Sequence, residues 1–140
     1  MEQSGLRRVG AHPRLYDAAS QVPILLGVEC TRCERVYFPP LDIGCESCGA
    51  TELTPTTLAA TGIVFAVATL HQHPGNPPAP FTIAEVLLDA GPLIRAMVHP
   101  DAGDLEIGAR VAGRWLVTES EDQTQTVEPA FVLAQSGQER

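Results

Sequence analysis

The chain has 140 residues and is 44% apolar, which fits one folded domain, or a small domain with an accessory module, and excludes an intrinsically disordered chain. Its formal net charge is −8, and all nine of its basic residues are arginine. An acidic protein repels a phosphate backbone, so the composition disfavours nucleic-acid binding.

The sequence contains no segment typical of membrane insertion or secretion. No apolar run reaches the ~18 residues that a membrane-spanning helix needs. The N-terminal stretch MEQSGLRRVGAHPRL lacks the apolar core of a signal peptide. We therefore expect a cytoplasmic protein, in which structural disulfides are disfavoured because the compartment is reducing.

Residues 1–23 are expected to form an N-terminal segment with little regular structure. Glycine and proline interrupt any periodic pattern before residue 14. Weak helical character over residues 15–20 predicts one short helix, which ends before Pro23.

All four cysteines lie within residues 24–53, which begin with an apolar strand at Ile24–Val28. Two Cys-x-x-Cys pairs are separated by eleven residues, and they comprise Cys30, Cys33, Cys45 and Cys48. A two-residue gap on a tight turn lets both sulfurs of a pair reach one metal ion. We expect the four thiolates to bind one structural Zn²⁺ in a zinc ribbon, because four protein ligands leave no open position for substrate.

Other uses of these thiols fit less well. Iron can occupy the same four thiolates and stays open. Two disulfides conflict with a reducing compartment, and a thioredoxin-type pair would lie at the start of a helix. Gly49 follows the second pair, where a small residue lets the chain turn back, whereas Glu34 follows the first. The ion's role would be to fold a segment too short to bury a core.

Two arginines and two aromatic residues accompany the first cysteine pair: Arg32, Arg35, Tyr37 and Phe38. Guanidinium and aromatic groups together can hold a phosphorylated, adenine-containing ligand through charge-assisted and stacking contacts. Alternatively, the aromatic rings pack the small core of the ribbon and the arginines are solvated. The residues leave both interpretations open.

Residues 54–136 consist of short β-rich segments separated by turns. We predict strands at residues 58–70, 81–88, 93–99, 111–118 and 127–134. Gly62 predicts a bulge or bend, and the two apolar faces of the second strand predict burial on both sides. Five short strands avoid exposed edges by closing into an antiparallel barrel. The predicted fold class is mostly β, with a zinc ribbon followed by a five-stranded OB-type barrel.

The histidines are the remaining candidates for chemistry. His71 and His73 share one face of a strand end and could bind a metal, but we favour a solvated strand end because no carboxylate lies nearby in the sequence. His12 and His99 each adjoin a proline and are expected at the surface. Trp115 is expected to lie in the barrel core. With no Ser-His-Asp spacing or phosphate-binding loop, we expect no catalytic residue in this chain.

The order of these elements resembles the DUF35 family, in which a rubredoxin-like zinc ribbon is fused to an OB-fold. The resemblance covers roughly residues 14–135. Its most specific parts are Phe38-Pro39-Pro40 after the first pair, the second Cys-x-x-Cys-Gly, and the Gly-Ile-Val that opens the barrel. Glu34 departs from the usual glycine without affecting the metal ligands.

The resemblance implies a non-catalytic subunit that associates with a thiolase-superfamily enzyme, often as an α2β2 heterotetramer. The partner would carry the catalytic groups of an acyl-CoA thiolase or retro-aldolase. This chain would help form the acyl-CoA tunnel and stabilise the assembly, with Arg32, Arg35, Tyr37 and Phe38 as candidate CoA contacts. The proline-rich loop at residues 74–80 and the exposed barrel strands would face the partner.

Two other function classes compete with this one. An OB-fold nucleic-acid-binding protein with a structural zinc ribbon would need basic grooves and surface aromatics, and the negative charge and 5% aromatic content argue against it. A metalloenzyme that uses His71 and His73 would bind more than one metal ion per chain.

Overall fold

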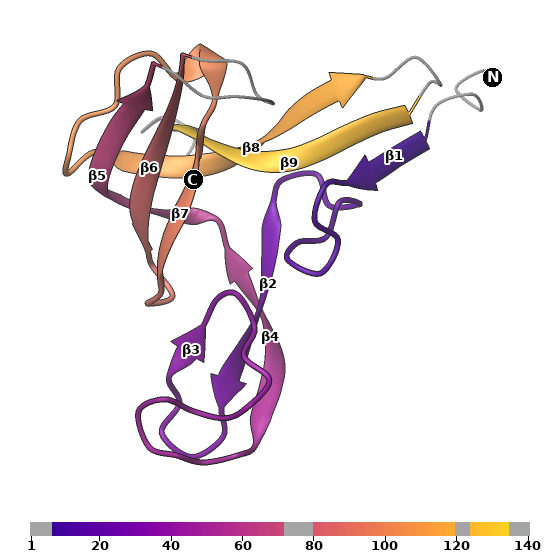
Figure 1. Ribbon diagram of the computed structural model, residues 1–140, viewed down its shortest axis with the longest axis vertical. Helices are drawn as coiled ribbons and strands as arrows, with labels where there is room; N and C mark the ends of the chain where they lie inside the picture. The colour runs from indigo at the N-terminus through magenta and orange to yellow at the C-terminus, as the bar shows by residue number, and fades with distance from the viewer. Residues whose placement is uncertain (1–6, 72–79, 120–123, 135–140) are drawn as a thin grey trace.

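The computed structural model describes residues 7–71, 80–119 and 124–134. The described chain is built of β-strands with one 3₁₀ turn at Pro100–Ala102 (Figure 1). None of its segments forms a helix suited to spanning a bilayer. The strands are β1 Arg7–Gly10, β2 Ile24–Cys30, β3 Val36–Tyr37, β4 Leu53–Ala59, β5 Thr61–Leu70, β6 Phe81–Leu88, β7 Leu93–Val98, β8 Arg110–Glu119 and β9 Thr124–Leu133.

Five strands close into a barrel. Around it β5 pairs with β6, β6 with β7, β7 with β9, β9 with β8, and β8 with β5. All of these pairs are antiparallel except β7–β9, and β1 adds to β9 from outside in parallel. Figure 1 shows the far ends of β8 and β9 projecting from the barrel, with β1 alongside. The predicted five-stranded barrel is confirmed.

Position 62 of β5 requires glycine, because the backbone of β6 approaches it closely. It pairs with Leu88 on one side and Val111 on the other, and a Cβ at this position would lie 2.2 Å from the Leu87 carbonyl oxygen. The bulge expected at Gly62 lies elsewhere, because the register of β5 against β6 shifts across Phe65. The bulge therefore lies three residues further along the chain than predicted, and the alternative of a bend at Gly62 stays a prediction.

β6 is buried on one face only. Ala84, Val86 and Leu88 face the barrel core, whereas Leu87 on the opposite face is 45% exposed. The expectation of burial on both sides was wrong, because no second layer covers the outer face within the described chain. An apolar outer face is thus left at the surface.

The ribbon half is a three-stranded sheet in the order β3-β2-β4. β4 pairs with β2 from Leu53 to Ala59, and β5 begins at Thr61, so the ribbon sheet runs directly into the barrel. The domain boundary expected between residues 53 and 54 stays a prediction. Leu25 and Leu58 of the ribbon belong to the same buried cluster as the barrel residues, so the two halves share one core.

The short helix expected over residues 15–20 is absent, and the N-terminal segment forms turns instead. Tyr16 makes an isolated β-bridge with Leu25. Its hydroxyl oxygen accepts a hydrogen bond from the His12 N–H at 2.8 Å, and the hydroxyl donates to the Val127 carbonyl at 3.0 Å. These contacts across the fold outweigh a weak local helix propensity.

Trp115 lies at the margin of the barrel core, where it contacts the N-terminal segment that contains Tyr16. Its ring is partly buried and packs 5.6 Å from the Tyr16 ring, centre to centre. The indole N–H donates to the Ser20 carbonyl at 2.9 Å, and the Arg8 guanidinium lies 5.3 Å from the ring centre. The N-terminal segment is therefore fixed to β8 by polar and aromatic contacts.

Candidate metal centre and adjoining cleft

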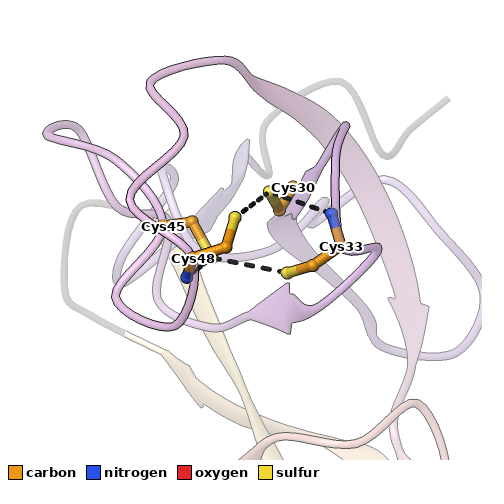
Figure 2. A group of neighbouring side chains, drawn as sticks. All are labelled: Cys30, Cys33, Cys45 and Cys48. Atoms are coloured by element: carbon orange, nitrogen blue, oxygen red, sulfur yellow. Dashed lines mark hydrogen bonds between the residues drawn. The ribbon is translucent and has the colours of Figure 1, made fainter.

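The four cysteine sulfurs gather at the tip of the ribbon, within 4.8 Å of one another (Figure 2). The Cys30–Cys48 and Cys33–Cys45 sulfur pairs are both 3.6 Å apart. A tetrahedral ion with 2.3 Å bonds holds its sulfurs about 3.8 Å apart, whereas a disulfide needs about 2.05 Å. The donor set therefore fits one tetrahedral metal ion, and the four cysteines are free of disulfides.

Each cysteine pair sits on the same kind of turn. The Glu34 N–H donates to the Cys30 carbonyl at 3.0 Å, and the Gly49 N–H donates to the Cys45 carbonyl at 3.0 Å. Both residues have a positive φ, 67° for Glu34 and 80° for Gly49. The first turn thus forms without the glycine that favours this conformation.

Backbone N–H groups surround one sulfur of each pair. The Cys30 sulfur accepts from the N–H groups of Arg32 and Cys33 at 3.4 and 3.5 Å. The Cys45 sulfur accepts from those of Ser47 and Cys48, both at 3.4 Å. Such donors stabilise the thiolate form, which is the form that binds metal.

Cys45 has a further neighbour in Tyr37, whose hydroxyl lies 3.2 Å from the sulfur. This hydrogen bond, followed by the Cys48 N–H, lowers the pKa of the Cys45 thiol to about 6. The pairing of Tyr37 with Cys45 was not found from the sequence, because the two residues are eight positions apart and no spacing rule joins them. Only the packing of β3 against the second cysteine turn brings them together.

The tip of the ribbon has little apolar core of its own. Cys30, Cys45 and Ala50 are its buried cluster, with Tyr37 and Leu53 packed against it, while Cys33 and Cys48 are exposed. So small a cluster supplies little of the free energy needed to order the tip. A bound ion would supply the rest.

A cleft of about 650 Å³ separates the ribbon tip from the turn between β6 and β7. Three of the four predicted ligand contacts line it: Arg35, Tyr37 and Phe38. Arg32 does not, and lines a separate hollow with Thr31, Ala50, Thr51 and Glu52. The full lining comprises Glu34, Arg35, Val36, Tyr37, Phe38, Glu46, Ser47, Ala90, Gly91, Pro92 and Leu93.

An apolar groove of about 330 Å³ lies behind Phe38, which lines both hollows. Its walls come from the N-terminal segment, β2, β6, β7 and β9, and the lining residues with polar groups are His12, Tyr16, Arg95 and Glu128. The apolar lining residues are Leu15, Leu25, Phe38, Ile83, Ile94, Ala96, Met97, Pro129 and Phe131.

A row of exposed apolar side chains crosses the outer face of the barrel. Ile63 pairs with Leu87, and Leu87 pairs with Leu93, and the three are 42%, 45% and 46% exposed. We call these three residues the outer row. Leu93 also lines the cleft, so the outer row is continuous with it.

Two ion pairs border the outer row. On one side Arg95 donates to Glu85 at 3.0 Å, and these two form the next β6–β7 pair on the same face, two register positions from Leu87 and Leu93. On the other side Arg110 donates to Asp89 at 2.8 Å. An apolar centre with a polar rim is the usual composition of a protein–protein interface.

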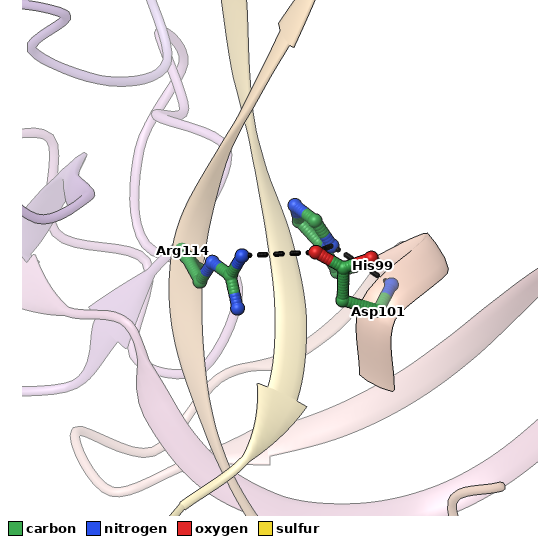
Figure 3. A network of polar contacts seen from close by, with 3 residues as sticks. All are labelled: His99, Asp101 and Arg114. Atoms are coloured by element: carbon green, nitrogen blue, oxygen red, sulfur yellow. Dashed lines mark hydrogen bonds and ion pairs between the residues drawn. The ribbon is translucent and has the colours of Figure 1, made fainter. Parts of the chain in front are cut away.

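His99 is buried, so its expected place at the surface was wrong. Its Nδ1 accepts from the Asp101 N–H at 3.0 Å and caps the 3₁₀ turn, and the Asp101 carboxylate pairs with Arg114 at 3.0 Å (Figure 3). His12 and His71 are exposed, as expected. His73 and residues 74–79 of the proline-rich loop lie outside the described residues, so the structure does not place the His71–His73 pair.

Comparisons with known proteins identify relatives that share both the ribbon and the barrel. The family described as "ChsH2, rubredoxin-like zinc ribbon domain" matches residues 18–54, and "ChsH2, C-terminal OB-fold domain" matches residues 56–116. A "DUF35 domain-containing scaffold protein" of Methanocaldococcus jannaschii is 34% identical over 91 residues, which are 62% of this chain and 64% of that protein.

A solved structure gives a similar result. A chain of the "Ltp2-ChsH2(DUF35) aldolase" superposes with a TM-score of 0.64 and 26% identity, over 79% of this chain and 85% of that chain. The two family matches follow one another along most of the chain, in the order of the ribbon and barrel seen here. The chain therefore belongs to the DUF35 family of ChsH2-like proteins, in which a rubredoxin-like zinc ribbon precedes an OB-fold.

Proposed function

We propose that this chain is the non-catalytic subunit of a thiolase-like enzyme that cleaves or forms carbon–carbon bonds in acyl-CoA substrates. The observation that carries the proposal is the likeness to a chain of the Ltp2-ChsH2(DUF35) aldolase, which extends over both the ribbon and the barrel. The scaffold description of the archaeal relative agrees with a subunit that organises a partner.

The four cysteines hold one structural Zn²⁺ in this proposal. Four thiolates at tetrahedral spacing favour zinc, and iron is the alternative that the same ligands accept. The ligands fill the coordination sphere, so the ion orders the ribbon tip and takes no part in a reaction.

The partner subunit covers the outer row. Its three apolar side chains pack against the partner, and the Glu85–Arg95 and Asp89–Arg110 pairs form the rim. Because Leu93 belongs to both the outer row and the cleft, a partner seated here also closes one side of the cleft.

CoA binds in the cleft between the two subunits, with the Arg35 guanidinium facing its phosphates and Phe38 beside its pantetheine or adenine. Glu34 and Glu46 line the same cleft and oppose an anion, so the partner must contribute further positive charge. Arg32 is left out of this proposed site, since it lines another hollow and not the cleft. The apolar groove behind Phe38 suits an acyl chain.

Co-expression with thiolase-superfamily proteins of the same genome tests the proposal. We expect one of them to co-purify with this chain, with activity on acyl-CoA only in the complex and about one zinc ion per chain. Ile63→Glu on the outer row should abolish co-purification, because burying a carboxylate against an apolar partner surface is strongly unfavourable.

Ile43→Glu is the matched control. Ile43 is 91% exposed on the ribbon, belongs neither to the outer row nor to the lining of the cleft, and takes the same substitution. Equal loss of binding in both variants would refute the assignment of the outer row. A chain that ignores every such partner and binds oligonucleotides instead would refute the function and favour a nucleic-acid-binding OB-fold.

A further inference from the structure

Tyr37 connects the metal centre to the cleft through a hydrogen bond whose direction can be assigned. Its hydroxyl oxygen lies 3.1 Å from the Glu46 backbone nitrogen and 3.2 Å from the Cys45 sulfur. A backbone N–H can only donate, so the hydroxyl oxygen accepts from Glu46. The hydroxyl proton is then available for the sulfur, and a thiolate can only accept it.

We propose that Tyr37 is a positioning residue of the metal centre, which donates to the Cys45 thiolate and holds the second cysteine turn against β3. This inference rests on the metal site of the proposed function. It also revises the expected role of Tyr37, because the hydroxyl has a single proton to donate, and a proton donated to Cys45 cannot also be donated to a CoA phosphate.

The two cysteine turns differ in their donors, which gives Tyr37 a specific effect. Cys30 accepts from two backbone N–H groups, whereas Cys45 accepts from two and from the Tyr37 hydroxyl in addition. A donor to a thiolate stabilises its charge and withdraws electron density from the metal–sulfur bond. The Cys45 thiolate should therefore be more strongly stabilised than the Cys30 thiolate, which occupies the same place in the other turn.

The same residue lines the cleft beside Arg35 and Phe38. A ligand or partner group in the cleft therefore lies against a side chain that is hydrogen-bonded to a metal ligand. Phenylalanine at position 37 would fill similar space, but it would leave the Glu46 N–H and the Cys45 sulfur without this partner. The hydroxyl, rather than the ring, is what the centre requires.

Release of zinc from the full-length, zinc-loaded chain to an excess of a coloured chelator tests this role. Tyr37→Phe should release zinc about tenfold faster or more, because such outer-shell partners change metal affinity by about 10–100-fold. Tyr16→Phe is the matched control, since it removes a hydroxyl that binds His12 and Val127 and no cysteine. Its release rate should equal that of the unaltered chain.

A spectroscopic measurement distinguishes a change in the electron density of the Cys45 thiolate from a mere loosening of the second cysteine turn. In the cobalt-substituted protein, Tyr37→Phe should shift the sulfur-to-cobalt charge-transfer bands to lower energy, because the thiolate loses a stabilising donor. Placing 3-fluorotyrosine, a stronger donor, at position 37 should shift them to higher energy and keeps the test valid even where Tyr37→Phe folds poorly. Unchanged bands together with an unchanged release rate would overturn the inference.

Failure of this inference is distinguishable from failure of the proposed function. An unaltered chain that binds neither zinc nor cobalt overturns the metal site and the role of Tyr37 together. A chain that binds one ion but responds alike to Tyr37→Phe and Tyr16→Phe overturns only the role of Tyr37.

Discussion

Glu34 and Gly49 occupy the same place in the two cysteine turns, and both adopt a left-handed backbone with φ of 67° and 80°. Each donates its N–H to the carbonyl of the first cysteine of its pair, at 3.0 Å. Only one of them is the residue type suited to that conformation.

Substitutions at these two positions should differ in their effect on the free energy of unfolding. Gly49→Ala should lower the free energy of unfolding by about 1 kcal/mol, because a left-handed backbone costs a residue with a Cβ about 1–2 kcal/mol. Glu34→Gly should leave it unchanged or raise it by up to about 1 kcal/mol, since relief of strain is offset by glycine's greater freedom when unfolded. Urea unfolding of the zinc-loaded protein checks both, and destabilisation by Glu34→Gly equal to that by Gly49→Ala would contradict the account.

Removal of the metal should disorder the ribbon tip and spare the barrel. The tip's own buried cluster is limited to Cys30, Cys45 and Ala50, whereas barrel residues such as Phe131 lie in the large cluster. Amide hydrogen exchange before and after chelation should show lost protection at residues 30–53 alone. Persistent protection of the tip in the metal-free protein would show that the ion is dispensable for folding.

The Asp89–Arg110 pair predicts a defined pH dependence. The Arg110 hydrogen bond, and then that from Thr61, hold the pKa of Asp89 below its ordinary value of 3.8. A carboxyl whose pKa is lowered by folding stabilises the fold above its unfolded pKa, and this contribution is lost as the pH falls through the folded pKa.

Asp89→Asn should therefore destabilise the protein at pH 7 and have no effect once the pH lies well below about 4. The loss at pH 7 should be at most about 1 kcal/mol, because both side chains are nearly half exposed. Thermal unfolding of both proteins across this pH range is the measurement. A destabilisation that persists unchanged at the lowest pH would point to packing rather than charge.

Arg35 and Arg32 should differ in their effect on CoA binding. Arg35 lines the cleft, whereas Arg32 lines the hollow beside Thr51 and Glu52. In the assembled complex, Arg35→Ala should weaken CoA binding about tenfold, as expected for loss of a charge-assisted hydrogen bond, and Arg32→Ala less than twofold. Glu46→Gln should strengthen CoA binding, because this substitution removes a negative charge from the cleft. Titration calorimetry with CoA would contradict the cleft assignment if Arg32→Ala had the larger effect.

The features that the sequence predicted well depend on short-range rules. Cysteine spacing predicted the cluster of Cys30, Cys33, Cys45 and Cys48, and runs of β-branched residues predicted the five barrel strands. Both follow from local geometry, because a two-residue gap brings sulfurs together and alternating apolar residues favour a strand.

The features that it missed depend on partners distant in the chain. The helix predicted over residues 15–20 is replaced by turns because the Tyr16 hydroxyl binds Val127, 111 residues away. The apolar alternation of β6 does not reveal which of its faces becomes the outside of the barrel. The Tyr37–Cys45 contact likewise exists only once β3 is folded against the second cysteine turn.

The central claim is that this chain functions as a subunit of a thiolase-superfamily complex. Size-exclusion chromatography with light scattering, on the co-expressed proteins and on this 14.9 kDa chain alone, tests it most directly. We predict a single species with the mass of two copies of each subunit, zinc equal to the number of copies of this chain, and dissociation by Ile63→Glu. Separate elution of the two proteins, with thiolase or aldolase activity undiminished in the partner alone, would contradict the account.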